Sequence, residues 1–257
     1  MEATMAPASS INYWPAEDCA KAFWSQCELP PYQELLAHTR EWLDPKPDQS
    51  WLDLGCGSGN LTRSLWTLAQ GRLRRIHSMD VAAVNERAFA KLRAELNASP
   101  QQIIFRVGDF SEGLPFLKDE SIDGVVSGLA LQYAESQDDN GWTDNGYDRV
   151  LGEIYRVLKP GGELVFSVNV PHPAWHRVAA NALGGIFQAD RPIRYIRRAW
   201  RMWTYGSWLT RESNRGRFHY LPWEALEQKL ANQHFVDLEH RMSYAGQAYL
   251  IRARKPM

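Results

Sequence analysis

Between residues 50 and 170, short apolar runs alternate with longer segments whose apolar residues recur at helical spacing. The short runs occupy residues 51–54, 76–80, 103–107, 122–127 and 163–168. The helical segments between them occupy residues 61–68, 84–96 and 147–158. Short buried strands separated by crossover helices are typical of a parallel sheet that is covered on both faces. The pattern therefore predicts an α/β fold with five parallel strands.

The C-terminal part of the chain adds three further elements. A helix is predicted at 222–233, with Pro222 near its first turn, and two strands follow at 235–242 and 247–253. A hairpin added to five parallel strands implies a mixed sheet with one antiparallel strand at or near its edge.

Two segments fall outside this alternating pattern. Residues 1–49, which contain several prolines, are expected to form a helical N-terminal cap in front of the main domain, residues 50–257. Residues 171–219 are expected to form a lid insertion after the fifth strand.

Composition places the chain among ordinary globular proteins. It has 257 residues, of which 44% are hydrophobic and 23% charged, so the disordered and fibrous classes are excluded. The three cysteines lack the spacing of a zinc or redox motif and are expected to be free thiols in a reducing compartment. No apolar run approaches the ~20 residues of a membrane span, and we expect a cytoplasmic protein.

Charge is unevenly distributed along the chain. The net charge is −1, yet residues 174–219 hold nine arginines and two acidic residues, a local charge of +7. If residues 193–203 are helical, their arginines and their apolar residues occupy opposite halves of the helix. This pattern fits an ordinary amphipathic cap, a lid over a lipid-like substrate, or contact of residues 190–203 with an anionic membrane surface.

A glycine-rich turn follows the first predicted strand. Residues 53–59 read Asp-Leu-Gly-Cys-Gly-Ser-Gly and precede a helix, so a ligand can lie against the backbone of Gly55, Gly57 and Gly59. A dinucleotide fingerprint would place its third glycine at position 60, which is asparagine here. Asp53 would repel a pyrophosphate but suits a cationic amino group. S-adenosylmethionine carries that ammonium group and no phosphate.

Two further acids stand at predicted strand ends. Asp80 ends the second strand, where a carboxylate can accept hydrogen bonds from both hydroxyls of a ribose. Asp109 follows the third strand, where it can accept from an adenine amino group, and Phe110 can flank the ring. Taken together with the glycine turn, these acids favour S-adenosylmethionine as the cofactor.

At this point the sequence resembles a known family. The turn at 53–59, Asp80, Asp109 and the segments 122–133 and 156–162 resemble the class I S-adenosylmethionine-dependent methyltransferases, especially the branch with quinone-biosynthesis and sterol-type enzymes. The resemblance implies a Rossmann-like, doubly wound, seven-stranded mixed sheet in which strand 7 is antiparallel. It also implies that the cofactor lies at the carboxyl ends of strands 1 to 4.

The resemblance also assigns cofactor contacts. The glycines would line the methionine moiety, Asp80 with Val81 beside it would take the ribose, and Asp109 the adenine. Tyr13 and Trp14 would close over the site. The full set of expected cofactor residues is Tyr13, Asp53, Gly55, Gly57, Gly59, Asp80, Val81, Asp109, Phe110, Ser127, Gly128 and Leu129.

Candidate catalytic residues lie beyond the strand ends. Tyr133 follows the fourth strand, and His172 follows the fifth between two prolines that fix the backbone around it. Both are candidates for positioning or deprotonating the acceptor. His172 and His176 are four residues apart, but the prolines prevent a regular helix and no third ligand is evident, so no metal is expected.

The sequence thus favours methyl transfer to a small-molecule acceptor, apolar or lipid-like in character. Two alternatives stay open. An RNA methyltransferase would use the arginines and aromatic residues of 174–219 to contact phosphates and bases, although the chain as a whole is not basic. A non-catalytic scaffold would retain the cofactor-binding fold for a partner.

Overall fold

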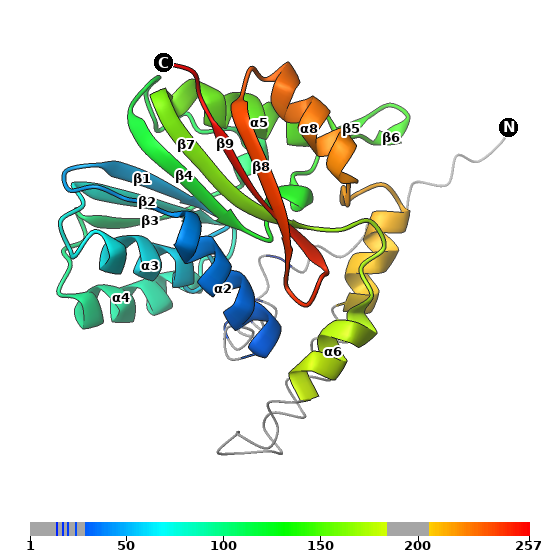
Figure 1. The fold of residues 1–257 in the computed structure, drawn as a ribbon, viewed down its shortest axis with the longest axis horizontal. Coiled ribbons are helices and arrows are strands. Elements are labelled where there is room, and N and C mark those ends of the chain that lie inside the picture. Colours follow the sequence, from blue (N-terminus) through cyan, green and yellow to red (C-terminus); the bar gives the residue numbers. More distant parts are fainter. Residues whose placement is uncertain (1–13, 15–16, 18–19, 21–23, 25–28, 184–205) are drawn as a thin grey trace, which may run out of the picture.

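The structure, a computed structural model, describes residues 14, 17, 20, 24, 29–183 and 206–257. Its centre is a seven-stranded sheet with the strand order β3-β2-β1-β4-β7-β9-β8 (Figure 1). The strands are β1 Ser50–Leu54, β2 Arg75–Asp80, β3 Ile103–Val107, β4 Ile122–Gly128, β7 Leu158–Asn169, β8 Val236–Ser243 and β9 Ala248–Arg254. A small separate hairpin consists of β5 Gln137–Asp138 and β6 Gly141–Trp142.

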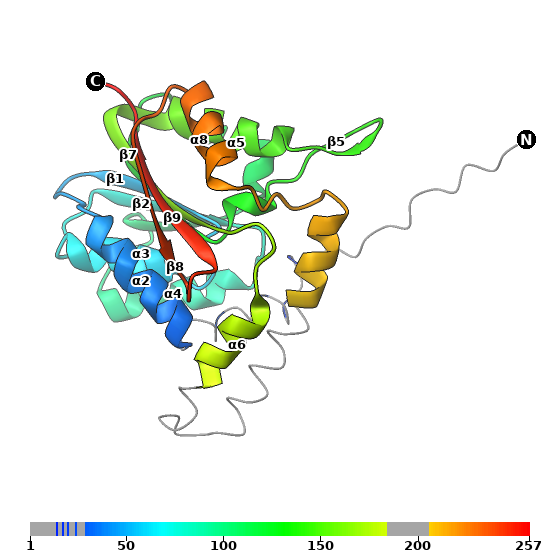
Figure 2. The same cartoon turned by 45° about the vertical axis from the view of Figure 1, so that its right-hand side comes forward.

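Helices cover both faces of the sheet. The named helices are α2 Pro30–Trp42, α3 Asn60–Leu68, α4 Asn85–Leu96, α5 Asn145–Val157, α6 Trp175–Leu183 and α8 Trp223–Asn232. Residues 206–214 are also helical, and two single 3-10 turns are η2 Phe110–Glu112 and η3 Leu131–Tyr133. Helices α2, α3 and α4 lie on one face, and α5 and α8 lie on the other (Figures 1 and 2).

Side-chain alternation along the strands builds two separate cores. Trp51 and Val126 pack with α3 and α4 on one face, whereas their neighbours Leu52 and Val125 pack with α5 and α8 on the other. Successive residues of a strand point to opposite faces, so a strand covered on both sides is apolar at most of its positions. This is why the sequence shows continuous apolar runs.

The topology brings a set of loops together at one edge of the sheet. The strands β1, β2, β3, β4 and β7 are mutually parallel, and the order reverses between β1 and its neighbour β4. Ligands of open α/β sheets bind beyond the carboxyl ends of the strands at such a reversal. The turn after β1 and the loops after β2, β3 and β4 meet there.

The predicted fold class is confirmed. Strand β9 is antiparallel to both β7 and β8 and lies second from the edge, because the chain first lays down β8 on the outside and then returns between β8 and β7. One detail differs from the sequence prediction. The fifth strand, predicted at residues 163–168, begins earlier, at Leu158, because Leu158 pairs with Ile122 directly after α5 ends.

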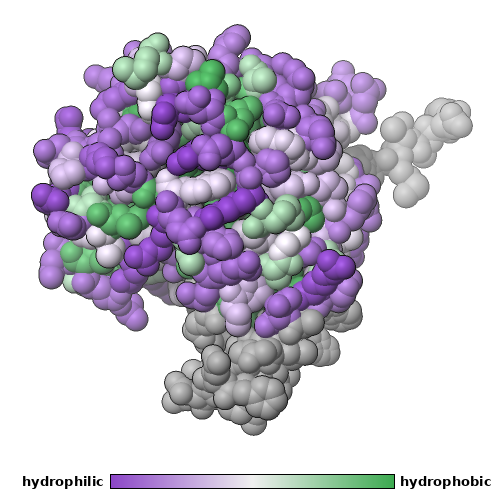
Figure 3. Space-filling view, viewed as in Figure 1, coloured by the Kyte–Doolittle hydropathy of each residue, from purple (hydrophilic) through white to green (hydrophobic). Residues whose placement is uncertain are grey.

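The N-terminal and lid predictions are only partly within the described residues. Helix α2 supplies part of the expected N-terminal cap, while the amphipathic segment 193–203 lies outside the described residues. No helix among the described residues is long and apolar enough to cross a bilayer. On the face seen in Figure 3, hydrophilic side chains predominate and hydrophobic ones are scattered in small groups.

A tight contact in the sheet yields a stability prediction. A Cβ atom on Gly124 would lie 2.5 Å from the ring of Trp51, its partner on the neighbouring strand, which is 1% exposed. We therefore expect Gly124→Ala to destabilise the fold by about 1–3 kcal/mol, the usual cost of overpacking a core. Urea unfolding monitored by circular dichroism measures this.

Gly152 in α5 serves as the matched control. A Cβ atom there would approach the flexible end of the Gln233 side chain at 3.2 Å, so Gly152→Ala should be neutral or should stabilise by up to about 1 kcal/mol through helix propensity. An unchanged stability in Gly124→Ala would show that the indole ring moves aside freely.

Candidate active site

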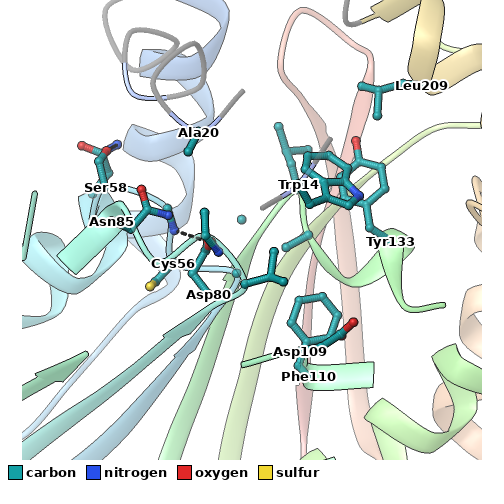
Figure 4. Close-up of a pocket in the computed structure, with 18 of the residues that line it drawn as sticks. Trp14, Ala20, Cys56, Ser58, Asp80, Asn85, Asp109, Phe110, Tyr133 and Leu209 are labelled. Carbon is teal, nitrogen blue, oxygen red and sulfur yellow. Dashed lines mark hydrogen bonds between the residues drawn. The ribbon is translucent and has the colours of Figure 1, made fainter. Parts of the chain in front are cut away.

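A pocket lies beyond the carboxyl ends of the central strands (Figure 4). Its walls come from the glycine turn, the loops after β2, β3 and β4, and residues that are distant in sequence. The distant residues are Trp14, Ala20, Tyr32, Trp175, Leu209 and Tyr244. In Figure 4, Asp80 and Asn85 lie at one side of the pocket and Trp14, Tyr133 and Leu209 at the other. The pocket thus has a polar end and an aromatic end.

The glycine turn is shaped by close packing. Gly55 has a φ of +67°, and a Cβ atom there would lie 2.3 Å from the Cβ of Ala130 in the loop after β4. The backbone N–H groups of Gly55 and Cys56 both donate to the Met79 carbonyl, which fixes the turn to the end of β2. Gly59 does not line the pocket; its missing side chain instead lets α3 approach Leu92 of α4.

Asp80 connects the turn to the loop after β2. Its Oδ2 accepts from the Gly57 N–H at 2.8 Å and its Oδ1 from the Ala82 N–H at 2.9 Å. Burial raises the pKa of Asp80, while these backbone donors favour its charged form. Asp80 and Val81 both line the pocket, and the nearby Asn85 accepts from Trp24 Nε1 at 2.6 Å.

Asp53 lies behind the turn rather than in the pocket. It is fully buried, and its Oδ2 accepts from the Thr62 hydroxyl of α3 at 2.6 Å. Its Oδ1 has no hydrogen-bond partner among the described residues, and burial raises its pKa from 3.8 to about 7. Direct contact between Asp53 and a ligand, expected from the sequence, is therefore wrong for this geometry. Strand alternation turns Asp53 to the Trp51 face, toward α3.

The loop after β3 forms a second wall of the polar end. Asp109 and Phe110 both line the pocket, and Asp109 Oδ1 accepts from the Ser111 N–H at 2.8 Å as the cap of η2. The Phe110 ring lies 3.6 Å from where a Gly55 side chain would begin. An aromatic face and a carboxylate are thus presented side by side.

At the end of β4, Ser127 does not take the cofactor-binding position expected from the sequence. Gly128 and Leu129 line the pocket, but Ser127 is 1% exposed and donates its hydroxyl to the Leu54 carbonyl at 2.8 Å. Ser127 therefore ties β4 to β1 and is not a pocket residue.

At the aromatic end, Tyr133 is the central side chain. Its ring centroid lies 4.6 Å from that of Trp14 and 4.9 Å from that of Phe218. Its hydroxyl lies 3.5 Å from the Tyr220 hydroxyl and accepts from Asn169 Nδ2 at 3.5 Å. Tyr133 is thus held by packing and by polar contacts while it lines the pocket.

His172 does not reach the pocket. Its side chain is exposed, its φ is +54°, and it is absent from the pocket lining. The exposed position of His172 outside the pocket does not support its catalytic interpretation. Tyr13, the other expected site residue away from the strand ends, lies outside the described residues.

Comparison with known proteins bears on this geometry. The family described as "Methyltransferase domain" matches residues 52–166. The ubiquinone/menaquinone biosynthesis C-methyltransferase UbiE of Acidiphilium cryptum is 29% identical over 202 residues, which cover 75% of each chain. Residues 52–166 therefore form a methyltransferase domain of the kind that the sequence resemblance implies.

One further relative and one solved structure extend the comparison. The biotin biosynthesis bifunctional protein BioHC of Teredinibacter turnerae is 38% identical over 130 residues, 48% of this chain and 20% of that protein. The chain thus spans about a fifth of that relative's length. The structure of Haemonchus contortus phosphoethanolamine N-methyltransferase 2 in complex with S-adenosyl-L-methionine has a TM-score of 0.60 and 16% identity, covering 98% of this chain and 62% of the other.

The polar end of the pocket fits S-adenosylmethionine chemically. The charged side chains among the described lining residues are the acids Asp80, Asp109 and Glu135, with no lysine, arginine or histidine. Such a lining suits a ligand with hydroxyl and amino donors and a sulfonium charge, and it disfavours a phosphate. Gly55 and Gly57 leave room against the backbone of the turn.

Sequence reasoning missed several residues that line the pocket. Asn169 ends β7 just as Asp80 ends β2, so the strand-end argument would have found it. Glu135, Trp175 and Tyr244 reach the pocket through contacts that have no local sequence signal.

Asp80 yields the first site prediction. We expect Asp80→Ala to weaken binding of S-adenosylmethionine and S-adenosylhomocysteine about tenfold to a hundredfold, because a hydrogen bond to a charged group contributes roughly 1.5–3 kcal/mol. Titration calorimetry measures both affinities. The exposed Asp44 supplies the control variant Asp44→Ala, and equal affinities in the two variants would contradict the assignment.

Asp53 yields a pH prediction. Its raised pKa means that the folded state holds a proton more tightly than the unfolded state between pH 3.8 and about 7. This contribution to stability is fully present below pH 3.8 and is lost as the pH rises through about 7. We expect Asp53→Asn to remove this loss of stability. At pH 8 the free energy of unfolding of the variant should then exceed that of the ligand-free wild type by on the order of a few kcal/mol. Chemical unfolding across this pH range tests it, and parallel curves for the two proteins would refute it.

Proposed function

We propose that this protein transfers the methyl group of S-adenosylmethionine to a small-molecule acceptor. In this proposal the turn at Gly55 and Gly57 holds the methionine moiety, and Asp80 with Val81 beside it holds the ribose. Asp109 and Phe110 hold the adenine. The observation that carries the proposal is that one pocket joins this polar end to the aromatic end around Tyr133.

The chemistry requires little of the protein beyond positioning. When bound, the sulfonium supplies a methyl group that an acceptor nucleophile can displace in line, leaving the electron pair of the C–S bond on sulfur. Most of the acceleration in such a step comes from holding the nucleophile against the methyl group. The packed rings of Trp14, Tyr133 and Phe218 form a wall that keeps the acceptor end apolar and excludes water.

The acceptor is best assigned from the pocket rather than from relatives. UbiE is named as a C-methyltransferase of quinone biosynthesis, whereas a Pectobacterium atrosepticum relative is named as a malonyl-[acyl-carrier protein] O-methyltransferase. The family therefore spans different acceptors. The aromatic side chains of this pocket favour a small molecule with an apolar body.

The RNA alternative finds little support in the described arginines of residues 174–219. Arg217 is 2% exposed and pairs with Glu135 and Glu212, so it is not available to a phosphate. Arg215 also pairs with Glu212. Arg177 and Arg211 are exposed, so among the described arginines only Arg217 and Arg215 count against RNA.

Turnover tests the proposal. The pure protein with methyl-labelled S-adenosylmethionine and a fractionated native extract should release S-adenosylhomocysteine and label the low-molecular-mass fraction. Label confined to RNA would favour the RNA alternative. Cofactor binding with no turnover in any fraction would favour the scaffold alternative.

Two variants then separate the candidate catalytic residues. We expect Tyr133→Phe to lower turnover about threefold to tenfold, since its hydroxyl makes one or two ordinary hydrogen bonds at the acceptor end. His172→Ala should leave turnover nearly unchanged because the imidazole faces solvent. A larger loss of steady-state rate in His172→Ala than in Tyr133→Phe would contradict this assignment and would support a catalytic role for His172.

A further inference from the structure

The pocket holds one carboxylate more than the proposed cofactor contacts use. Asp80 and Asp109 are assigned to the ribose and the adenine, and Glu135 is left over. Glu135 follows η3, lines the pocket, and has a side chain that is 21% exposed. Its Oε1 is paired with Arg217 at 2.8 Å.

Arg217 does not neutralise Glu135 fully, because its guanidinium also pairs with Glu212. Its Nη1 pairs with Glu212 at 3.1 Å, and both Arg217 and Glu212 are only 2% exposed. Two carboxylates therefore share one buried guanidinium, while Arg215 reaches Glu212 from the exposed side at 2.9 Å. Burial raises the pKa of Glu135, Arg217 opposes this, and the charges of Asp109 and Glu212 add to the rise. A buried ionic group of this kind is costly to fold, and it places a carboxylate in the wall of the pocket.

Asn169 provides a second, independent indication. It ends β7, is 2% exposed, and lines the pocket close to Tyr133. Its Nδ2 donates to Tyr133, but its Oδ1 has no hydrogen-bond partner among the described residues. A buried acceptor atom without a donor lowers stability unless a ligand supplies that donor.

The surrounding walls are aromatic. Trp175 connects two apolar clusters, one with Tyr32 and Tyr244 and the other with Trp14 and Tyr133. Ring faces pack well against a flat apolar body and attract a cation. The described lining residues include no cationic side chain, which an anionic acceptor would need as a partner.

We propose that the methyl acceptor is a small amine with a flat apolar body, whose N–H groups are received by Glu135 and Asn169. This assignment rests on the proposed function. Arg217 and Glu212 act as positioning residues that fix the orientation of the Glu135 carboxylate. In the transfer step the neutral amine nitrogen bonds to the methyl carbon as the C–S bond breaks, with its electron pair going to sulfur. The N–H proton then passes to the second carboxylate oxygen of Glu135 and on to water.

Three probes of equal shape test the acceptor class. Tryptamine, tryptophol and indole-3-propionate differ mainly in their terminal amine, hydroxyl or carboxylate, and each is titrated into the protein saturated with S-adenosylhomocysteine. We expect tryptamine to bind at least about tenfold more tightly than tryptophol, as a charge-assisted hydrogen bond would give, and indole-3-propionate to bind weakest.

Matched acid variants separate the two ends of the pocket. Glu135→Gln should abolish the preference for tryptamine. It should leave the affinity for S-adenosylhomocysteine within about twofold of the wild-type value, a change far smaller than the loss of one hydrogen bond to a charged group would cause. Asp109→Asn should weaken the binding of S-adenosylhomocysteine and leave the preference for tryptamine unchanged. Asp138→Asn, on the exposed β5 strand, should change neither affinity.

Arg217 has its own readout. Removing its charge in Arg217→Met should raise the pKa of Glu135, since the guanidinium favours the carboxylate. The acid limb of tryptamine binding should therefore move to higher pH. A purely structural role would instead lower the affinity equally at every pH.

Several results would overturn the amine assignment. These are indole-3-propionate binding as tightly as tryptamine, no probe binding to the S-adenosylhomocysteine complex, or Glu135→Gln weakening S-adenosylhomocysteine as Asp109→Asn does. If the wild type binds neither S-adenosylmethionine nor S-adenosylhomocysteine, the proposed function itself fails, which is a distinct outcome.

Discussion

Gly55 packs so tightly against the loop after β4 that a Cβ atom there would lie 2.3 Å from the Cβ of Ala130. This backbone approach holds the ends of β1 and β4 together where the strand order reverses. The Gly55 and Cys56 N–H groups, bound to the Met79 carbonyl, and the Gly57 N–H, bound to Asp80, attach the end of β2 to the same turn. Phe110 then packs against the turn from the loop after β3. The polar end of the pocket is therefore set by main-chain contacts.

The aromatic end depends on contacts of a different kind. Tyr133 ends η3, shortly after β4, but the rings packed against it come from Trp14 and Phe218, which are far away in the sequence. The ion pair between Glu135 and Arg217 also joins the segment after β4 to the segment that contains Phe218. The aromatic end is thus built from side chains that are distant in sequence, whereas the polar end is built at the strand ends. This division is consistent with a family whose named members act on different acceptors.

Local patterns were sufficient to predict the strands, their parallel arrangement and the placement of Asp80 and Asp109 in the pocket. Each follows from strand periodicity and from the rule that parallel strands end at one edge. The same alternation puts Asp53 on the face of Trp51, so its burial toward α3 was implied by the sequence but not recognised. His172 lies outside the pocket lining, and this could not be predicted, because two prolines restrict a backbone without determining where the side chain points. Glu135 and Tyr244 depend on long-range packing, which no local pattern encodes.

A crystal structure of the protein with S-adenosylhomocysteine tests the central claim most directly. The account predicts that the ribose hydroxyls lie within hydrogen-bond distance of Asp80, that the adenine amino group lies at Asp109, and that the sulfur faces the end of the pocket formed by Tyr133 and Trp175. Ligand density outside this pocket, or an adenosyl group in the opposite orientation with its sulfur directed away from Tyr133, would contradict it.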